Sequence, residues 1–173
     1  MNKENLEKLK NRAIVMAEET VQKQETSSAT EVITFILDVE TYAIESAFVR
    51  EVYQIKDFTT LPGVPSFIFC IINIRGQILP VIDLKKFFNL PEKGFGELNK
   101  VIILSNDLME FGILADEVRG TETIEQDDLQ PVPQNISSIG EEFLRGVTKK
   151  GLILLNAERM LSDKKLVVYD EVN

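Results

Sequence analysis

Residues 73–84, with the sequence NIRGQILPVIDL, constrain the fold of this chain more than any other stretch. Apolar runs at 67–74 and 78–82 flank Arg75 and Gly76, a charged residue beside a flexible one. Two apolar runs separated by such a pair predict two β-strands joined by a tight turn. Gly76 can adopt the positive φ angle that this kind of turn often requires, and Arg75 is then left at the tip.

Two residues after the predicted turn indicate how the second strand is used and where it ends. Pro80 lacks a backbone N–H donor, so we expect it at an edge or a bulge of the sheet rather than in its middle. Asp83 follows the second apolar run directly and precedes residues 84–88, LKKFF. Its carboxylate can accept the free backbone N–H groups of a short helix there. The predicted order is strand, turn, strand and capped helical turn.

A related pattern occurs in the second half of the chain. Residues 79–88 align without a gap with residues 152–161, which places Asp83 opposite Asn156 as the cap of a second helical turn. Few residues are identical, so the match lies in the roles of the residues. We therefore expect the body of the chain to consist of two copies of one small β unit. The apolar pairs at the ends of the two segments should pack beneath the strands: Phe87 and Phe88, and Met160 and Leu161.

The composition excludes several classes of protein. The chain has 173 residues, of which 44% are apolar, and no apolar run reaches the roughly 18 residues of a membrane span. We therefore expect a globular, cytoplasmic protein that does not insert into a membrane. Its formal charge of −9 argues against binding to nucleic acid, because phosphate groups attract clustered Lys and Arg. Its single cysteine, Cys70, lies in an apolar run, which favours a buried thiol in a reducing compartment.

Residues suited to catalysis are scarce. The chain has no histidine, which excludes imidazole acid–base catalysis, the Ser-His-Asp triad and the commonest zinc sites. Acidic residues are abundant at 107–128, where eight face a single arginine, and such a run indicates a solvated face or a docking surface for a basic partner. Asp116, Asp127 and Asp128 leave a metal-dependent hydrolase open as an alternative, although no calcium-loop spacing surrounds them.

Residues 1–30 differ from the rest of the chain. They contain no Gly or Pro, and apolar residues recur among them at three- and four-residue steps. This pattern predicts an amphipathic helix that ends near Gln24, followed by a polar linker at 26–30. A frayed appendage, packing on the body and packing on another protein all remain open. We assign residues 1–30 as a helical extension with its linker, and residues 31–173 as the folded domain.

From Val32 onward the pattern is that of β-structure. Short runs rich in β-branched and aromatic residues alternate with turn residues, and the first turn is expected at Glu40 and Thr41. Many short strands with only brief helical turns predict an all-β fold of small barrels or a sandwich. The expected strands are 32–39, 42–44, 48–55, 67–74, 78–82, 100–104, 110–115, 120–124, 143–148, 152–155 and 166–169.

Together these segments resemble the CheW family, the adaptor proteins of bacterial chemoreceptor arrays. The resemblance covers residues 32–170 and rests on ITFILDVETYAI, VREVYQI, LPGVPSFI leading into INIRGQILPVIDL, GTETI, and EFLRGV followed by GLILLNAERML. It implies a CheW-like domain of two SH3-like five-stranded β-barrels that share a hydrophobic interface. The first barrel would occupy residues 32–92 and the second residues 98–172.

The resemblance also implies a function without catalysis. Proteins of this family couple the histidine kinase CheA to methyl-accepting chemotaxis receptors. One barrel pairs with the regulatory domain of the kinase, and a groove between the barrels takes the helical hairpin tip of the receptor. We expect no enzymatic activity, no cofactor and no metal. The protein should be located at receptor arrays through these partners. The residues that bind the kinase are not assigned. The family's receptor-contacting arginine falls on Arg75, and the further receptor-binding candidates are Glu51, Val49, Val52, Ile74 and Gly76.

Two features depart from the family pattern. The family usually has a glycine where this chain has Cys70, which here follows Phe69 rather than a polar residue. The N-terminal helix is also longer than the usual short lead. These differences leave the partner open, so the alternative is a paralogue that serves a gliding, pilus or developmental pathway. A ligand-sensing barrel with an apolar pocket between its halves is a further alternative.

Overall fold

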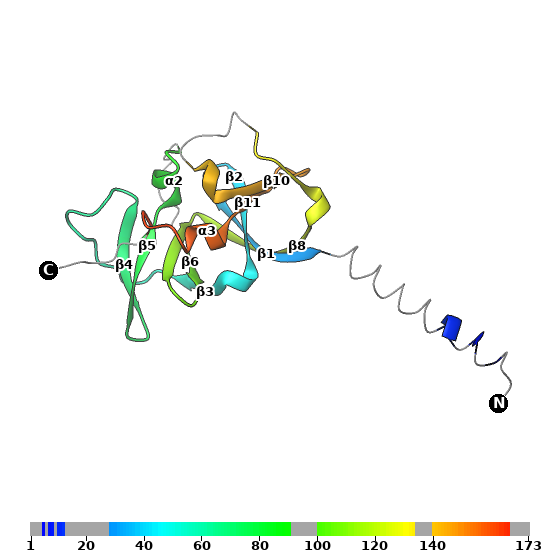
Figure 1. Cartoon of the computed structure of the whole chain (residues 1–173). Helices are drawn as coiled ribbons and strands as arrows, with labels where there is room; N and C mark the ends of the chain where they lie inside the picture. Colours follow the sequence, from blue (N-terminus) through cyan, green and yellow to red (C-terminus); the bar gives the residue numbers. More distant parts are fainter. Residues whose placement is uncertain are drawn as a thin grey trace.

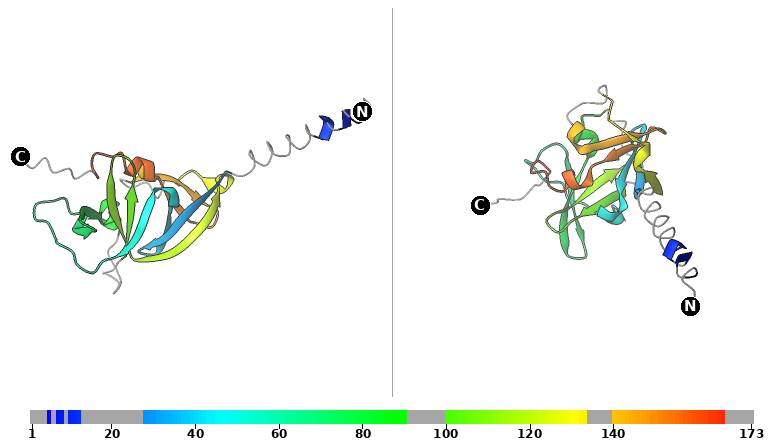
Figure 2. Two further views of the ribbon diagram at one scale, coloured as in Figure 1. Left: turned by 90° about the horizontal axis from the view of Figure 1, so that it is seen from below. Right: turned by 45° about the vertical axis from the view of Figure 1, so that its right-hand side comes forward.

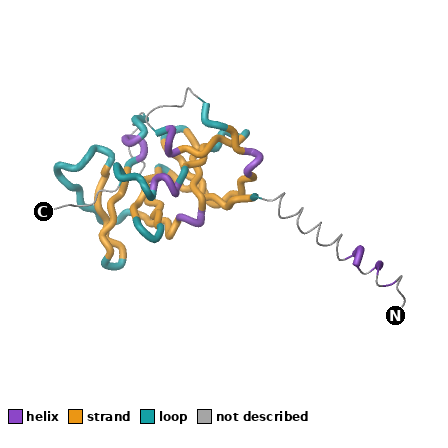
Figure 3. The backbone as a smooth tube through the Cα atoms, viewed as in Figure 1, coloured by secondary structure: helices purple, strands orange, loops and turns teal. Residues whose placement is uncertain are grey.

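The computed structural model describes residues 5, 7–8, 10–12, 28–90, 100–133 and 140–166. The body consists of two β-sheets with only short helical turns, which confirms the predicted all-β class (Figures 1 and 3). The described residues between 5 and 12 are helical and exposed, in agreement with the predicted N-terminal helix. Within the described part of the chain, no helix is long and apolar enough to cross a membrane.

The first sheet has six strands, in the order β8-β1-β2-β11-β10-β9. Its neighbours pair antiparallel, except that β11 and β2 run parallel. The first strand already begins inside the polar stretch that we predicted as a linker. The strands are β1 (Ala29–Leu37), β2 (Glu40–Glu45), β8 (Glu117–Glu125), β9 (Leu129–Gln130), β10 (Leu144–Thr148) and β11 (Ile153–Leu155).

The second sheet has five strands, in the order β3-β6-β7-β5-β4, and its single parallel pair is β5 with β7. The strands are β3 (Val49–Gln54), β4 (Ile68–Ile74), β5 (Gln77–Ile82), β6 (Lys100–Ser105) and β7 (Glu110–Ala115). The short helices are α2 (Leu84–Phe87), α3 (Ala157–Met160) and the 3-10 turns η1 (Ser46–Phe48), η2 (Gln126–Asp128) and η4 (Glu141–Phe143).

The two sheets do not follow the sequential halves, 32–92 and 98–172, into which the repeat divides the chain. The hairpin β1–β2 from the first half joins β8 to β11, whereas the hairpin β6–β7 from the second half joins β3 to β5 (Figure 2). Each half thus gives its first hairpin to the other sheet. The local pattern predicts a hairpin but not its partner, because pairing between distant strands depends on contacts that no short window of sequence contains.

The repeat itself is present in the structure. Both β5 and β11 have one antiparallel and one parallel neighbour, and each leads into a capped helical turn. The Asp83 carboxylate accepts the backbone N–H of Lys85 at 3.0 Å and of Lys86 at 3.4 Å. The Asn156 side chain accepts the backbone N–H of Arg159 at 3.0 Å. Both predicted caps are confirmed.

The first turn lies two residues earlier than predicted. Asp38 and Val39 form it, whereas Glu40 and Thr41 belong to β2. Asp38 has a φ of 58°, and its backbone N–H donates to the Asp116 carboxylate at 2.8 Å. An aspartate tolerates this left-handed conformation better than most residues, so Asp38 was the sequence signal that the prediction missed.

Three apolar clusters show how the sheets are packed. The largest contains residues of both sheets, including Phe35 and Phe111, and it forms the interface between them. A second cluster, with Cys70 and Val101, belongs to the five-stranded sheet, and a third, with Ala43 and Leu154, belongs to the six-stranded sheet. Each sheet therefore encloses its own core. Phe88, Met160 and Leu161 are buried in the shared cluster and Phe87 packs against it, as predicted.

The structure describes only the first residue of the strand that we expected at 166–169. Leu166 is buried in the shared cluster but lies in a turn rather than in a strand. The rest of the strand expected at 166–169 lies outside the described residues, as do parts of the predicted N-terminal helix and linker.

Candidate functional site

The β4–β5 turn presents Arg75 as the sequence predicts. Ile74 pairs with Gln77 across a two-residue turn in which Arg75 has a φ of 52° and Gly76 a φ of 85°. Two successive positive φ angles are typical of the type I′ hairpin turn, which matches the twist of the flanking strands. The Asn73 side chain accepts the Gly76 backbone N–H at 2.9 Å and closes the turn. The Arg75 side chain is 75% exposed.

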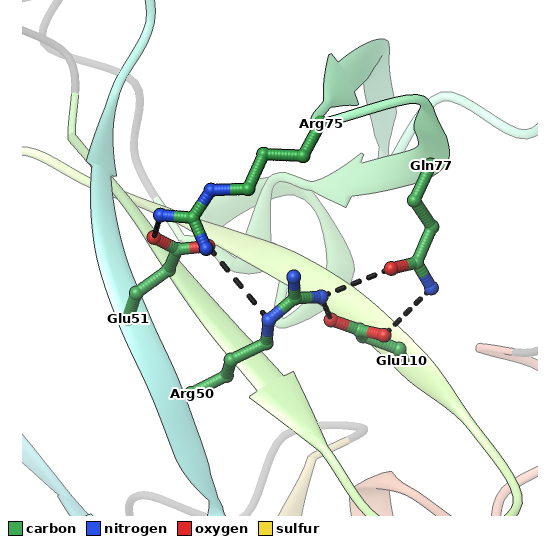
Figure 4. A network of polar contacts seen from close by, with 5 residues as sticks. All are labelled: Arg50, Glu51, Arg75, Gln77 and Glu110. Atoms are coloured by element: carbon green, nitrogen blue, oxygen red, sulfur yellow. Dashed lines mark hydrogen bonds and ion pairs between the residues drawn. The ribbon is translucent and has the colours of Figure 1, made fainter.

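Glu51 lies opposite this turn and contacts Arg75. Glu51 belongs to β3, an edge strand of the same sheet, and its Oε2 is 3.5 Å from Nη2 of Arg75 (Figure 4). The residues come from separate strands, β3 and the β4–β5 hairpin, that are not neighbours in the sheet. The structure therefore brings together the two charged residues of the predicted receptor-binding set.

The other members of the predicted set differ in their access to a partner. Val52 is exposed, whereas Val49 is half-buried against the shared cluster. Gly76 is exposed in the turn, but Ile74 is only 4% exposed and packs inside the five-stranded sheet. Ile74 is thus a core residue next to the turn, and its side chain is not accessible to a partner. Arg75, Glu51 and the turn backbone therefore lie together, and Val52 is exposed next to Glu51 along β3.

Three further residues complete the polar network, and the sequence analysis did not identify them. Arg50 on β3 forms an ion pair with Glu110 on β7, and its Nη1 donates to Gln77 Oε1 at 3.0 Å. Gln77 on β5 in turn donates to Glu110 at 2.8 Å (Figure 4). The ion pair joins residues 60 positions apart in the chain. No local motif could have indicated it.

The network holds two positive and two negative side chains at close range. The Glu110 carboxylate, by hydrogen bond and by charge, raises the pKa of the Arg50 guanidinium above its usual value. Glu51 Oε1 lies 3.8 Å from Nε of Arg50, and this oxygen is buried without a hydrogen-bond partner. Glu51 therefore stands between two arginines, with Oε1 toward Arg50 and Oε2 toward Arg75.

A pocket of about 400 Å³ lies beside this network. It runs between β5 and the β6–β7 turn, with the exposed Ile78 and Leu108 on its rim and the buried Leu166 in its wall. The pocket lies against the five-stranded sheet, and Met109, Phe111 and Leu166 in its lining also belong to the shared cluster between the two sheets. A ligand-sensing barrel with an apolar pocket between its halves remains a prediction.

The acids of the hydrolase alternative do not meet. Asp116 Oδ1 pairs with the buried Lys85 at 2.7 Å and its Oδ2 accepts the Asp38 N–H, so this carboxylate has a structural role. Asp127 and Asp128 lie in η2, in the six-stranded part of the body. Among residues 5–12, 28–90, 100–133 and 140–166, as far as these are described, no three side chains of the metal-binding types cluster.

Comparison with known proteins identifies the family. Residues 31–165 match the family model described as CheW-like domain. The chain is 33% identical over 143 residues to "Chemotaxis protein CheW" of Treponema pallidum, covering 79% of this chain and 84% of that protein. It is 31% identical over 122 residues to "Protein FrzA" of Myxococcus xanthus, covering 68% and 76%. The crystal structure of the scaffolding protein TtCheW from Thermoanaerobacter tengcongensis superposes with a TM-score of 0.67 at 30% identity, over 75% of this chain and 85% of that one.

Proposed function

The chain belongs to the CheW-like family, and we propose that it is a non-enzymatic adaptor that couples a CheA-type histidine kinase to methyl-accepting chemotaxis receptors. In this role the protein acts in the cytoplasm, at arrays of membrane-bound receptors to which its partners attach it. The observation that carries the proposal is the pairing of the exposed Arg75 with Glu51 from a different strand. Both residues occupy the positions that the family resemblance assigns to receptor contact.

The chemistry of this surface suits a helical hairpin tip. Arg75 offers a planar set of donors to carboxylates or backbone carbonyls. Val52 supplies exposed aliphatic surface nearby on β3, and a helix in a groove requires such anchors with a polar rim. Individual contacts of this kind are weak, but an array presents many copies, and multivalency then makes the assembly firm.

The receptor contact is tested by Arg75→Ala in the full-length protein. We expect about tenfold or greater loss of affinity for a cognate receptor tip fragment, measured by isothermal titration calorimetry, because arginines at interface centres often dominate binding. The matched control is Lys150→Ala, which removes one positive charge from the β10–β11 turn, the counterpart of the β4–β5 turn in the other sheet. Equal affinities of wild type, Arg75→Ala and Lys150→Ala would remove Arg75 from the site.

The kinase contact is tested separately, with the isolated regulatory domain of the cognate kinase. We expect wild type and Arg75→Ala to bind this domain equally, because the proposed adaptor must hold both partners at once on different surfaces. If Arg75→Ala weakened kinase and receptor binding alike, the two partners would share one surface and the coupling role would be wrong.

A second candidate is the same adaptor chemistry in a pathway that controls gliding, pili or development. The similarity to Protein FrzA supports it, since the family relatives of this chain include a protein not named as a chemotaxis CheW. The affinities of the chain for receptor tips from the different chemosensory pathways of one organism distinguish the two candidates. The receptor that binds most tightly identifies the pathway.

A further inference from the structure

The network around Arg75 has equal numbers of positive and negative side chains although the protein as a whole is strongly acidic. The chain carries a formal charge of −9, yet the network contains Arg50 and Arg75 against Glu51 and Glu110. Without Arg50 the same surface would hold one arginine against two glutamates. Removal of Arg50 therefore turns the network from neutral to net negative.

The two arginines hold Glu51 in different ways. Arg75 is 75% exposed and contacts Oε2 at 3.5 Å, a length at which a charged hydrogen bond is weak. Arg50 is 32% exposed, faces the buried Oε1 and is fixed on its other side by Gln77 and Glu110. If a partner takes Arg75, Glu51 keeps a positive neighbour in Arg50. The Arg75 guanidinium can thus change partners without leaving a carboxylate alone.

We propose that the Arg50–Glu110 pair contributes to specificity. It sets the charge of this surface so that the Arg75 guanidinium can bind a carboxylate of the receptor tip. The inference rests on the proposed function and adds the chemistry of the partner group. A carboxylate that binds Arg75 would lie close to Glu51 and in the same network as Glu110, and their repulsion would oppose it if Arg50 did not offset them. Gln77 connects the pair to the β4–β5 turn, two residues after Arg75.

Two substitutions that break the same ion pair test this assignment because their charges change in opposite directions. Arg50→Gln makes the network net negative, and Glu110→Gln makes it net positive. For a receptor tip fragment with an acidic contact residue, we expect about fivefold weaker binding by Arg50→Gln and about fivefold tighter binding by Glu110→Gln. The double variant, Arg50→Gln with Glu110→Gln, is neutral again and should bind about as wild type does.

The readouts are the affinity and the association rate at low and high salt. Both single-variant effects should shrink at high salt, because ions screen charges that are partly exposed. They should also shrink when the acidic residue of the fragment is replaced by its amide. Circular dichroism melting curves of all three variants establish that each one is folded.

The outcomes separate this inference from the proposed function. If wild type does not bind the receptor tip, both fail. If wild type binds and Arg75→Ala does not, but Arg50→Gln and Glu110→Gln weaken binding equally, the pair only supports the structure, and the inference alone is overturned. Unchanged affinity in both single variants overturns it as well. Effects of opposite sign that disappear with the amide fragment establish it.

Discussion

Lys85 and Asp116 form an ion pair at the point where the two halves of the chain exchange their hairpins. Nζ of Lys85 lies 2.7 Å from Oδ1 of Asp116, and the Lys85 side chain is only 5% exposed. Lys85 belongs to α2 after β5, and Asp116 connects β7 to β8, so the pair joins the first half to the crossing between the sheets. Asp116 also accepts the N–H of Asp38 in the β1–β2 turn.

The first prediction concerns this ion pair. Lys85→Met leaves the Asp116 carboxylate without its buried cation, and we expect about 2 kcal/mol lower free energy of unfolding, below the usual order for a fully buried pair because the Asp116 side chain is 24% exposed. Urea denaturation measures the change. Lys149→Met, at an exposed position in the β10–β11 turn, is the matched control and should alter stability by less than about 0.5 kcal/mol. A loss below 1 kcal/mol for Lys85→Met would mean that the ion pair does not stabilise the connection between β7 and β8, where the chain passes from one sheet to the other.

The second prediction concerns the buried thiol of Cys70. Burial raises the pKa of Cys70 to about 12. The folded state holds the thiol proton of Cys70 more tightly than the unfolded state does. The contribution of this group to the free energy of unfolding is therefore fully present below the pKa of the unfolded thiol, and it is lost as the pH rises toward 12. Between pH 9 and 11 the free energy of unfolding should fall by up to about 1.4 kcal/mol per pH unit from this group.

Cys70→Ala is the control for that measurement. It should show a shallower pH slope over the same interval in urea denaturation, because only the thiol contribution is removed. Tyr42 contributes in the same direction at higher pH, since burial and the neighbouring Glu40 raise its pKa, and its contribution remains in Cys70→Ala. Identical slopes in the two proteins would contradict the burial of the thiol.

The third prediction concerns the turn that presents Arg75. Gly76 has a φ of 85°, and no neighbouring atom would clash with a side chain at this position. A substitution there lowers the stability only because the backbone conformation is unfavourable for a residue with a side chain. Gly76→Val should lower the free energy of unfolding by about 1–3 kcal/mol, whereas Gly76→Asn should cost less because asparagine tolerates this conformation. Thermal melts rank the variants. We also expect Gly76→Val to weaken receptor-tip binding by moving Arg75, and equal binding by both variants would contradict this.

The fourth prediction concerns the caps of the two helical turns. Asp83→Ala and Asn156→Ala each remove an acceptor of backbone N–H groups, and each should cost about 1 kcal/mol of stability. Asp83→Ala should be the more destabilising change, because Asp83 is buried and accepts from two N–H groups, whereas Asn156 accepts from one. Equilibrium denaturation of both variants tests the ranking, and a larger cost at Asn156 would reverse it.

The features predicted correctly from the sequence are mainly those with local causes. The turn at Arg75 and Gly76 and the caps Asp83 and Asn156 depend on residues within a few positions of one another, and the structure confirms them. The prediction that Pro80 lies at an edge or a bulge of the sheet is wrong. Its strand, β5, lies inside the sheet, but pairing with β7 begins only at Val81, so the proline has no ladder partner on that side.

The features that the sequence did not predict have non-local causes. The exchange of hairpins and the Arg50–Glu110 pair depend on which strands meet, and this choice is made by the packing of the whole body. The signal for Glu51 was the family resemblance, since a half-buried glutamate on an edge strand is not distinctive by itself. The receptor-binding roles of Arg75, Glu51, Val49, Val52, Ile74 and Gly76 stay predictions until binding is measured.

The exchange of hairpins has a consequence for how this protein is made. During synthesis, β1 and β2 leave the ribosome before the other strands, yet the parallel neighbour of β2 is β11, the last of the described strands to emerge. The sheet that contains β3, β4 and β5 likewise remains incomplete until β6 and β7 have been synthesised. Neither sheet can be completed while the polypeptide is half finished, so the nascent chain should acquire its stable structure late and in a single cooperative step.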